Sequence, residues 1–301
     1  MMRTLTNLRI TGFDRLIYGL VALWVLAMIS VPILNWTLGE QGFIAGVVLG
    51  VLLQIAAVMV AVGRAWGIGR ALALVAVVVL IAWLSEYIGH NTGFPFGDYH
   101  YTDRLQPQIG DVPILVPLAW LMMLPPAWAV AAVITRGRRW LFIAVSALTF
   151  TAWDLFLDPQ MVSWRLWLWD NPGDFNYFGI PWVNFAGWLL VSAIMTTAAT
   201  LLFPLPEKLP LRPLLVVYVI TWALQTIGQL FFWGLPGSAL VGCAAMGACL
   251  LAAWRMSPHP PTPSPTLGEE GHSSPLSPLA GELVRAERGF RGEGQGRGNH
   301  D

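Results

Sequence analysis

Long apolar stretches alternate with short polar ones along most of the chain. A helix needs about 20 mostly apolar residues to cross a bilayer. We therefore predict an all-α fold, a polytopic membrane bundle of about eight transmembrane helices. The predicted spans lie near residues 16–35, 41–62, 71–89, 113–134, 139–157, 182–203, 213–233 and 236–254.

Two connections between these spans are very short, one around Gly39 and Glu40 and the other from Gly234 to Pro236. Short connections make the helices that they join antiparallel neighbours. Small residues inside the spans should also let helices approach each other closely. The residues in question are Gly46, Gly50, Gly242 and Gly247.

Composition supports a membrane protein and divides the chain into two parts. The sequence is 56% hydrophobic and 11% charged, whereas soluble domains usually carry about 25% charged residues. Its formal net charge is zero, so nothing indicates a nucleic-acid partner. We assign residues 1–255 to the helical bundle. Residues 256–301 are rich in Pro, Gly, Ser, Glu and Arg, a composition typical of a disordered tail.

The basic residues predict how the bundle is oriented. Most of the 17 Lys and Arg residues fall on the side that holds both termini, and only Arg104 and Arg165 fall on the other side. The positive-inside rule then places both termini in the cytoplasm. We expect a multi-pass protein of the cell (plasma) membrane, with the polar loops 86–112 and 154–185 facing outward.

Those two loops hold nearly all the acidic residues of the membrane part. Ionisable groups near a bilayer are costly, so such a cluster indicates a functional site. The loops are also rich in aromatic residues, and we expect Trp164, Trp167 and Trp169 to belong to an interfacial belt. The acidic residues are Glu86, Asp98, Asp103, Asp111, Asp154, Asp158, Asp170 and Asp174.

The first candidate group surrounds the end of the third span. Glu86 and His90 are four residues apart and should share one face of a helix. The segment from Gly93 to Gly97 should then form a turn, which brings Asp98 and His100 back toward the helix end.

The second candidate group lies at the end of the fifth span. Asp154 and Asp158 are also four residues apart, and we expect Pro159 to end the helix directly after them. Asn184 sits just inside the following span. A purely structural role is also open for Asp158, because Asp before Pro is common where a helix stops.

Both groups should meet at one membrane face and form a single pocket. It would have carboxylates at its base, aromatic walls and an apolar floor that opens to lipid. A carboxylic acid in an apolar setting can stay protonated and act as a general acid, and aromatic faces stabilise a nearby cation. This combination suits protonation of an alkene and capture of the carbocation. The candidate catalytic residues are Glu86, Asp154, Asp158, Asn184, His90 and Asp98.

The same side chains could instead serve structure or bind a metal. Glu86 and Asp154 could cap helices or pair with Arg104 and Arg165 at the surface. Glu86, His90, Asp98 and His100 are acceptable metal ligands, but their spacing matches no zinc motif, and the His-rich boxes of membrane di-iron enzymes are missing. No phosphate loop, Ser-His-Asp arrangement or dinucleotide motif is present. We therefore predict chemistry without a metal or other cofactor.

Two stretches, 85–120 and 152–188, resemble the carotenoid biosynthesis membrane proteins of the CruF type. The span layout of residues 15–255 agrees with that family, and the tail has no counterpart. The features that carry the resemblance are Glu86, the turn Thr92–Gly97, Asp154, Asp158-Pro159, the turn Gly179–Pro181 and Asn184-Phe185.

The resemblance implies a carotenoid 1,2-hydratase, in the group that includes bisanhydrobacterioruberin hydratases. Such an enzyme adds water across the terminal double bond of an acyclic carotenoid end. The expected partners are a carotenoid substrate (lycopene, γ-carotene or a C50 carotenoid), membrane lipid and other enzymes of the pathway. We expect Asp154 or Glu86 to donate the proton while the other orients water with Asn184, supported by His90 and Asp98.

Two rival classes of function stay open at this point. One is another membrane isoprenoid enzyme, either a carotenoid cyclase or a UbiA-like prenyltransferase. A cyclase would use the same protonation but exclude water, whereas a prenyltransferase would need a second Asp-rich helix to hold Mg²⁺ and diphosphate. The other class is a non-catalytic lipid transporter, which the absence of charged residues along a path through the membrane disfavours.

Overall fold

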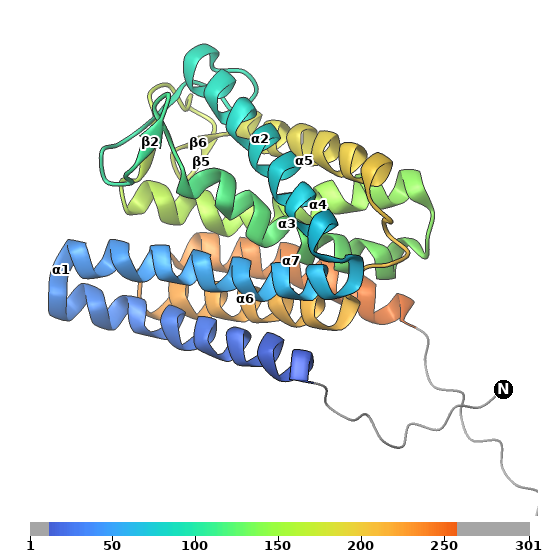
Figure 1. Ribbon diagram of the computed structural model, residues 1–301. Helices are drawn as coiled ribbons and strands as arrows, with labels where there is room; N and C mark the ends of the chain where they lie inside the picture. Colours follow the sequence, from blue (N-terminus) through green and yellow to red (C-terminus); the bar gives the residue numbers. More distant parts are fainter. Residues whose placement is uncertain (1–11, 258–301) are drawn as a thin grey trace, which may run out of the picture. The chain divides into compact units, whose positions relative to one another are not determined.

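Residues 12–257 are described by the computed structural model, and their architecture is a bundle of long helices (Figure 1). Seven of these helices are long and apolar enough to cross a membrane. The predicted all-α membrane bundle is therefore confirmed. The helices are α1 (Gly12–Trp66), α2 (Ile68–Thr92), α3 (Leu115–Thr135), α4 (Arg139–Ser163), α5 (Trp182–Leu202), α6 (Leu211–Phe231) and α7 (Pro236–Met256). The predicted tail lies, from residue 258 onward, outside the described residues.

The first two predicted spans form the two arms of α1. The helix breaks at Gly39, whose backbone angles (φ 64°, ψ −149°) are open only to glycine without strain. The chain then folds back, and Figure 1 shows the two arms side by side. A Cβ on Gly46 would lie 3.1 Å from Leu34, and one on Gly50 would lie 2.6 Å from Met28. The predicted short turn and the close approach at Gly46 and Gly50 are therefore confirmed.

The other predicted short connection is also present, because α6 ends at Phe231 and α7 begins at Pro236. A Cβ on Gly242 of α7 would lie 2.6 Å from the ring of Phe156 on α4, so this glycine is needed for close packing. Gly247 differs, since a Cβ there would make only an ordinary contact at 3.6 Å. Glycine at position 247 is thus not required by packing.

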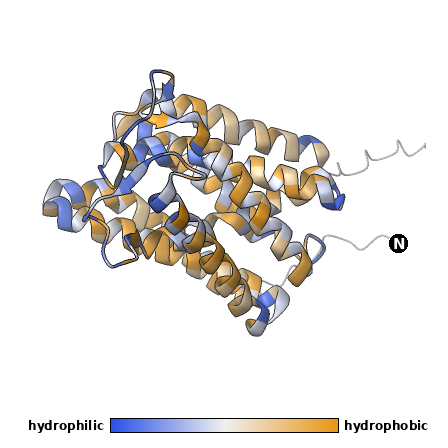
Figure 2. Ribbon diagram, turned by 90° about the horizontal axis from the view of Figure 1, so that it is seen from above, coloured by the Kyte–Doolittle hydropathy of each residue, from blue (hydrophilic) through white to orange (hydrophobic). Residues whose placement is uncertain are grey.

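The polar loops lie together at one end of the bundle, which we call the loop end. This end contains the turn of α1, the α2–α3 and α4–α5 loops, and the α6–α7 turn. The rings of Phe43 and Trp164 are 4.7 Å apart, and those of Trp164 and Trp233 are 4.9 Å apart. At the opposite end, Trp66 links the end of α1 to the α5–α6 connection, because its Nε1 donates to the backbone oxygen of Lys208 at 2.7 Å. Figure 2 shows the hydrophobic helices and the hydrophilic loops that follow from this division.

Short antiparallel strand pairs, which the hydrophobic pattern did not predict, organise the two loops. β2 (Gln108–Ile109) pairs with β3 (Val112–Pro113), and β5 (Asn176–Tyr177) pairs with β6 (Ile180–Pro181). The third pair joins the loops to each other, because β1 (Tyr99–Tyr101) runs beside β4 (Trp167–Trp169). In this pair Tyr99 faces Trp169 and Tyr101 faces Trp167.

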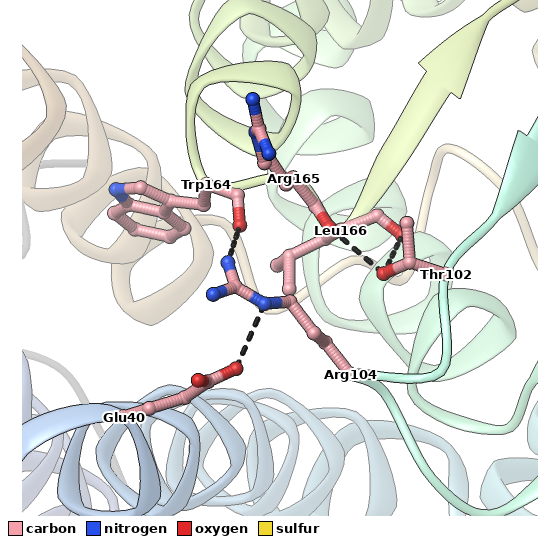
Figure 3. A network of polar contacts seen from close by, with 6 residues as sticks. All are labelled: Glu40, Thr102, Arg104, Trp164, Arg165 and Leu166. Carbon is pink, nitrogen blue, oxygen red and sulfur yellow. Dashed lines mark hydrogen bonds and ion pairs between the residues drawn. The ribbon is translucent and has the colours of Figure 1, made fainter.

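A polar network ties the α1 turn to both loops (Figure 3). Arg104 Nε lies 2.8 Å from Glu40 Oε1, and its Nη1 donates to the backbone oxygen of Trp164. Beside it, Thr102 donates through its backbone nitrogen to Leu166 O at 3.1 Å. Arg104 therefore holds the α1 turn against the loops at the loop end.

Candidate active site

The turn after α2 directs the chain back onto the bundle. Gly93 ends the helix in the left-handed conformation (φ 74°), and its backbone nitrogen donates to Gly89 O. Gly97 also has a positive φ of 90°, and its nitrogen donates to Gly93 O at 2.7 Å. The turn packs tightly on α5, since a Cβ on Gly187 would lie 2.6 Å from Pro95 O. The predicted turn is confirmed, and it delivers β1 to the end of α2.

Glu86 is buried near the end of α2 and is held by three donors. The hydroxyls of Tyr99 and Tyr101 donate to Glu86 Oε2 at 2.6 and 2.7 Å, and Trp120 Nε1 donates to Oε1 at 3.1 Å. The side chain is 4% exposed. Because all three partners donate, the arrangement suits a carboxylate that accepts hydrogen bonds.

The two tyrosines keep their protons over a wide pH range. Burial, followed by the charge of the nearby Glu86, raises the pKa of Tyr99 well above its ordinary value. The same two causes raise the pKa of Tyr101. Both phenols are therefore permanent donors to Glu86 at physiological pH.

Asp154 and Asp158 form a second carboxyl centre on α4, shared with Asn184 of α5. Asn184 Nδ2 donates to Asp154 Oδ2 at 3.2 Å and also to Asp158 Oδ2. Trp167 Nε1 donates to Asp158 Oδ1 at 3.1 Å. Because the two carboxyl groups accept from the same amide, they lie close together in a buried site. Two buried carboxyl groups this close do not both ionise readily, so the pair can hold one proton and supply it.

The structure corrects the prediction that Pro159 ends the helix, because α4 continues to Ser163. A proline has no backbone N–H, so the carbonyl of Leu155 lacks its usual partner inside the helix. Tyr177 fills this position by donating its hydroxyl to Leu155 O at 3.0 Å. The helix therefore continues, and Asp158 lies inside it instead of at a helix stop.

His90 and Asp98 do not join either carboxyl centre. His90 is half-buried, and its ring lies 6.4 Å from the rings of both Tyr99 and Tyr101. Asp98 is exposed and lies 3.5 Å from Asn171. The candidate metal ligand His100 pairs with Asp170 at 3.0 Å, also near the surface. Within residues 12–257, no three His, Cys, Asp or Glu side chains gather in a way that could hold a metal ion.

A surface role for the acids is wrong for Glu86 and Asp154. Both side chains are buried, at 4% and 0% exposure, and their hydrogen-bond donors are neutral groups. Arg104 instead pairs with Glu40. Glu86 also lies well inside α2, which continues to Thr92, so it does not cap that helix.

A cavity of about 420 Å³ lies beside both carboxyl centres. Glu86, Asp158 and Asn184 line it, whereas Asp154 lies behind Asp158 and does not. The rest of the lining is mainly apolar and aromatic, from α1, α3, α4, α5, α6 and the loops. The described part of the chain thus has the predicted pocket with acids in an aromatic wall.

The cavity reaches the side of the bundle between the first arm of α1 and α6. Ile29 of α1 and Ile227 of α6 both line the cavity, and both are about half exposed on the outer surface. Phe232, which follows α6, lines this side as well. In a bilayer this surface faces lipid, so an apolar chain can enter the cavity sideways.

Aromatic residues that the sequence analysis did not assign to the site complete its lining. Trp167 and Trp169 were expected in an interfacial belt, but both are buried and line the cavity, as does Trp164. The belt prediction is therefore wrong for Trp167 and Trp169, whereas it stays a prediction for the half-buried Trp164. Trp120 and Tyr101 were also missed, and only their position beside the Glu86 motif in the sequence could have suggested them.

Comparison with known proteins places the chain in a family. The model of the carotenoid biosynthesis protein family matches residues 46–249, and the chain belongs to this family. A relative, the bisanhydrobacterioruberin hydratase of Haloarcula japonica, is 34% identical over 137 residues. That alignment covers 44% of this chain and 44% of the relative, so the chain spans less than half of the relative's length. No solved structure matches the chain.

Proposed function

We propose that the protein is a carotenoid 1,2-hydratase. It adds water across the terminal C1–C2 double bond of an acyclic carotenoid end. The observation that carries the proposal is a buried pair of carboxyl groups, Asp154 and Asp158, bridged by the Asn184 amide beside an aromatic cavity that opens toward lipid. Family membership and the partial similarity to a hydratase support it.

The cavity suits one end of a carotenoid. Its volume of about 420 Å³ accommodates an end group and a short part of the polyene. The remaining chain then extends between α1 and α6, past Ile29 and Ile227, into the bilayer. Entry from the side needs no passage of the substrate through water, in which a carotenoid is insoluble.

In the first step Asp158 delivers the proton that it shares with Asp154 to C2 of the alkene. The π electrons of the double bond form the new C–H bond and leave a tertiary cation at C1. The aromatic rings that line the cavity, Trp120, Trp153 and Trp188, stabilise this charge. Glu86 adds the charge of a carboxylate held by three donors.

In the second step a water oxygen forms a bond to C1. The water then loses one proton to Glu86, and that proton returns to the aspartate pair through solvent or water in the cavity. The product is a tertiary alcohol, and the net change is the addition of one water. Asp158, not Asp154, is the group that faces the substrate in this scheme, because only Asp158 lines the cavity.

The proposed enzyme acts within a membrane. The protein is a multi-pass membrane protein, and we place it in the plasma membrane with both termini in the cytoplasm and the loop end outward. Carotenoid then reaches the site through the lipid phase, from the enzymes that make it.

Expression of the full chain in a lycopene-producing bacterium tests the activity. We expect pigments heavier by one water with an unchanged chromophore, measured by chromatography and mass spectrometry. Membranes that carry the Asp158→Asn variant at equal abundance serve as the control and should give no such product. A product of unchanged mass but shorter chromophore would instead establish a cyclase. The same expression is repeated in strains that make γ-carotene or a C50 carotenoid. If none of the three carotenoids gains water, the proposal is contradicted.

A further inference from the structure

The inner part of the cavity contains polar groups that the hydration chemistry does not use. Trp24 lines the cavity, and its Nε1 is buried without a hydrogen-bond partner among the described residues. Gln54 also lines the cavity and is 3% exposed. Its Nε2 lies 3.5 Å from Met122 O, at the limit of a hydrogen bond to oxygen, and 3.5 Å from Met123 Sδ, which is only a weak acceptor. Its Oε1 has no partner within residues 12–257.

Trp24 and Gln54 face each other across the α1 hairpin. A Cβ on Gly46 would contact Val31, and a Cβ on Gly50 would contact Met28. The two arms run antiparallel. Moving four residues forward along the second arm therefore corresponds to moving about four residues backward along the first arm. One step beyond Gly50 and Met28 therefore brings Gln54 opposite Trp24.

This pair lies close to the carboxyl level of the cavity. Gln54 approaches Met122, which is two residues further along α3 than Trp120, the donor to Glu86. Two helical residues correspond to about 3 Å along the axis. The two polar groups thus lie slightly deeper than Glu86, in the wall formed by α1.

The chemistry of the pair selects a neutral oxygen. An indole N–H only donates, and an amide oxygen only accepts, so a hydroxyl group can satisfy both at once. Among the described residues, the only charged ones that line the cavity are Glu86 and Asp158, and both are acidic. A phosphate or diphosphate would meet no positive charge there, so an anionic ligand is excluded.

We propose that Trp24 and Gln54 form a hydroxyl-binding subsite in the cavity. The inference rests on the proposed function, because it assumes that the cavity holds a carotenoid end. Two sources of the hydroxyl share this chemistry, a hydroxyl group that the carotenoid already carries and the water that is added. The subsite is neutral, lies in the α1 wall of the cavity, and orients the oxygen relative to the reacting end.

The test compares the wild type with Gln54→Leu and Trp24→Phe, and uses Trp140→Phe as the matched control. Trp140 is 71% exposed and does not line the cavity. Purified full-length proteins in detergent are titrated with an acyclic carotenoid hydrocarbon and with its monohydroxylated derivative. Quenching of tryptophan fluorescence gives Kd, and product analysis gives kcat. Thermal unfolding monitors folding, and we expect no loss of stability in Gln54→Leu, because no good hydrogen bond is removed.

If the subsite binds a substrate hydroxyl, both variants should weaken binding of the hydroxylated carotenoid about tenfold and leave the hydrocarbon unchanged. If it binds water, Kd should stay constant and kcat should fall about tenfold for both carotenoids. If Kd and kcat of both variants stay within about twofold of the wild type for both carotenoids, the subsite is overturned. Failure of the proposed function is recognised separately, since the wild type itself would then form no hydrated product while the Kd comparison still tests the subsite.

Discussion

At the residue scale, the three buried acids divide into two different environments. Glu86 accepts hydrogen bonds from three fixed donors, whereas Asp154 and Asp158 lie side by side and share one amide donor. Carboxyl groups in different environments take different roles in acid–base chemistry. The pair on α4 is suited to giving a proton, and the group on α2 is suited to accepting one.

Neutral amide variants of the acids should separate these roles. We expect Asp158→Asn to reduce kcat by about 100-fold or more, since it removes the proton donor. Asp154→Asn removes the partner that shares the proton, and Glu86→Gln removes the acceptor, so both should also abolish measurable turnover. The measurement is product formation per folded protein in detergent. Asp174→Asn is the matched control. Asp174 is an exposed acid in the α4–α5 loop, so this variant should retain full activity.

The tyrosines around Glu86 predict an alkaline limit to stability. Their pKa values are raised in the folded protein by burial and by Glu86. Above pH of about 10 the unfolded chain ionises first and binds fewer protons than the folded one, so the free energy of unfolding falls as pH rises. Below that pH the contribution is fully present.

Thermal unfolding between about pH 8 and pH 11 measures this effect, because the range spans the ordinary pKa of tyrosine. The double variant Tyr99→Phe/Tyr101→Phe should be less stable at the lower end, because Glu86 loses two donors at about 1.5 to 3 kcal/mol each. Its melting temperature should then fall less steeply than that of the wild type as pH rises. Parallel curves for the two proteins would contradict the assignment of the alkaline limb to these residues.

At the element scale, α1 positions one whole wall of the cavity. Its two arms supply Met28 and Gln54 among the lining residues, and Glu40 at its turn is bound by Arg104. The turn itself depends on Gly39, because its φ and ψ lie where side chains other than glycine are strained.

Gly39→Ala should therefore destabilise the bundle by about 1 to 3 kcal/mol through backbone strain alone. A Cβ at this position meets nothing within 4 Å, so no clash contributes. Gly19→Ala is the matched control: Gly19 lies in the first arm of α1, is exposed, and also has open space around its Cβ position. Alanine favours a helix there, so its melting temperature should equal or exceed that of the wild type.

At the scale of the whole molecule, the loop end and the opposite end differ in charge. The loop end holds both acidic loops, whereas the opposite end holds the connections with Arg136 and Lys208. The positive-inside rule predicts that the loop end faces out of the cell.

Single cysteines at the two ends test this orientation. Both native cysteines, Cys243 and Cys249, are half-buried in α7 and are first replaced by serine. Asp174→Cys and Lys208→Cys place thiols at exposed positions. A membrane-impermeant maleimide should label position 174 in intact cells and position 208 only after permeabilisation. The reverse pattern would refute the predicted orientation while leaving the fold unaffected.

Much of this protein could be predicted from its sequence alone. The length of the apolar segments predicted the helices, and the gathering of acids in two polar loops identified Glu86, Asp154 and Asp158, which line or adjoin one cavity. These predictions succeed because hydrophobic burial in a bilayer and the 3.6-residue period act over a few neighbouring residues. Two conclusions were wrong for the same reason: Pro159 was taken to end a helix and Trp167 to lie in a belt, because local rules describe only local surroundings.

Only the tertiary structure decided which groups surround the acids. Pairing of β1 with β4 brings Trp167 to Asp158, packing of α3 brings Trp120 to Glu86, and Tyr177 replaces the hydrogen bond that Pro159 cannot make. The separation of Asp154 from the cavity also depends on how helices pack. Contacts between residues far apart in the chain depend on the joint packing of several elements, and no periodicity in the sequence records them.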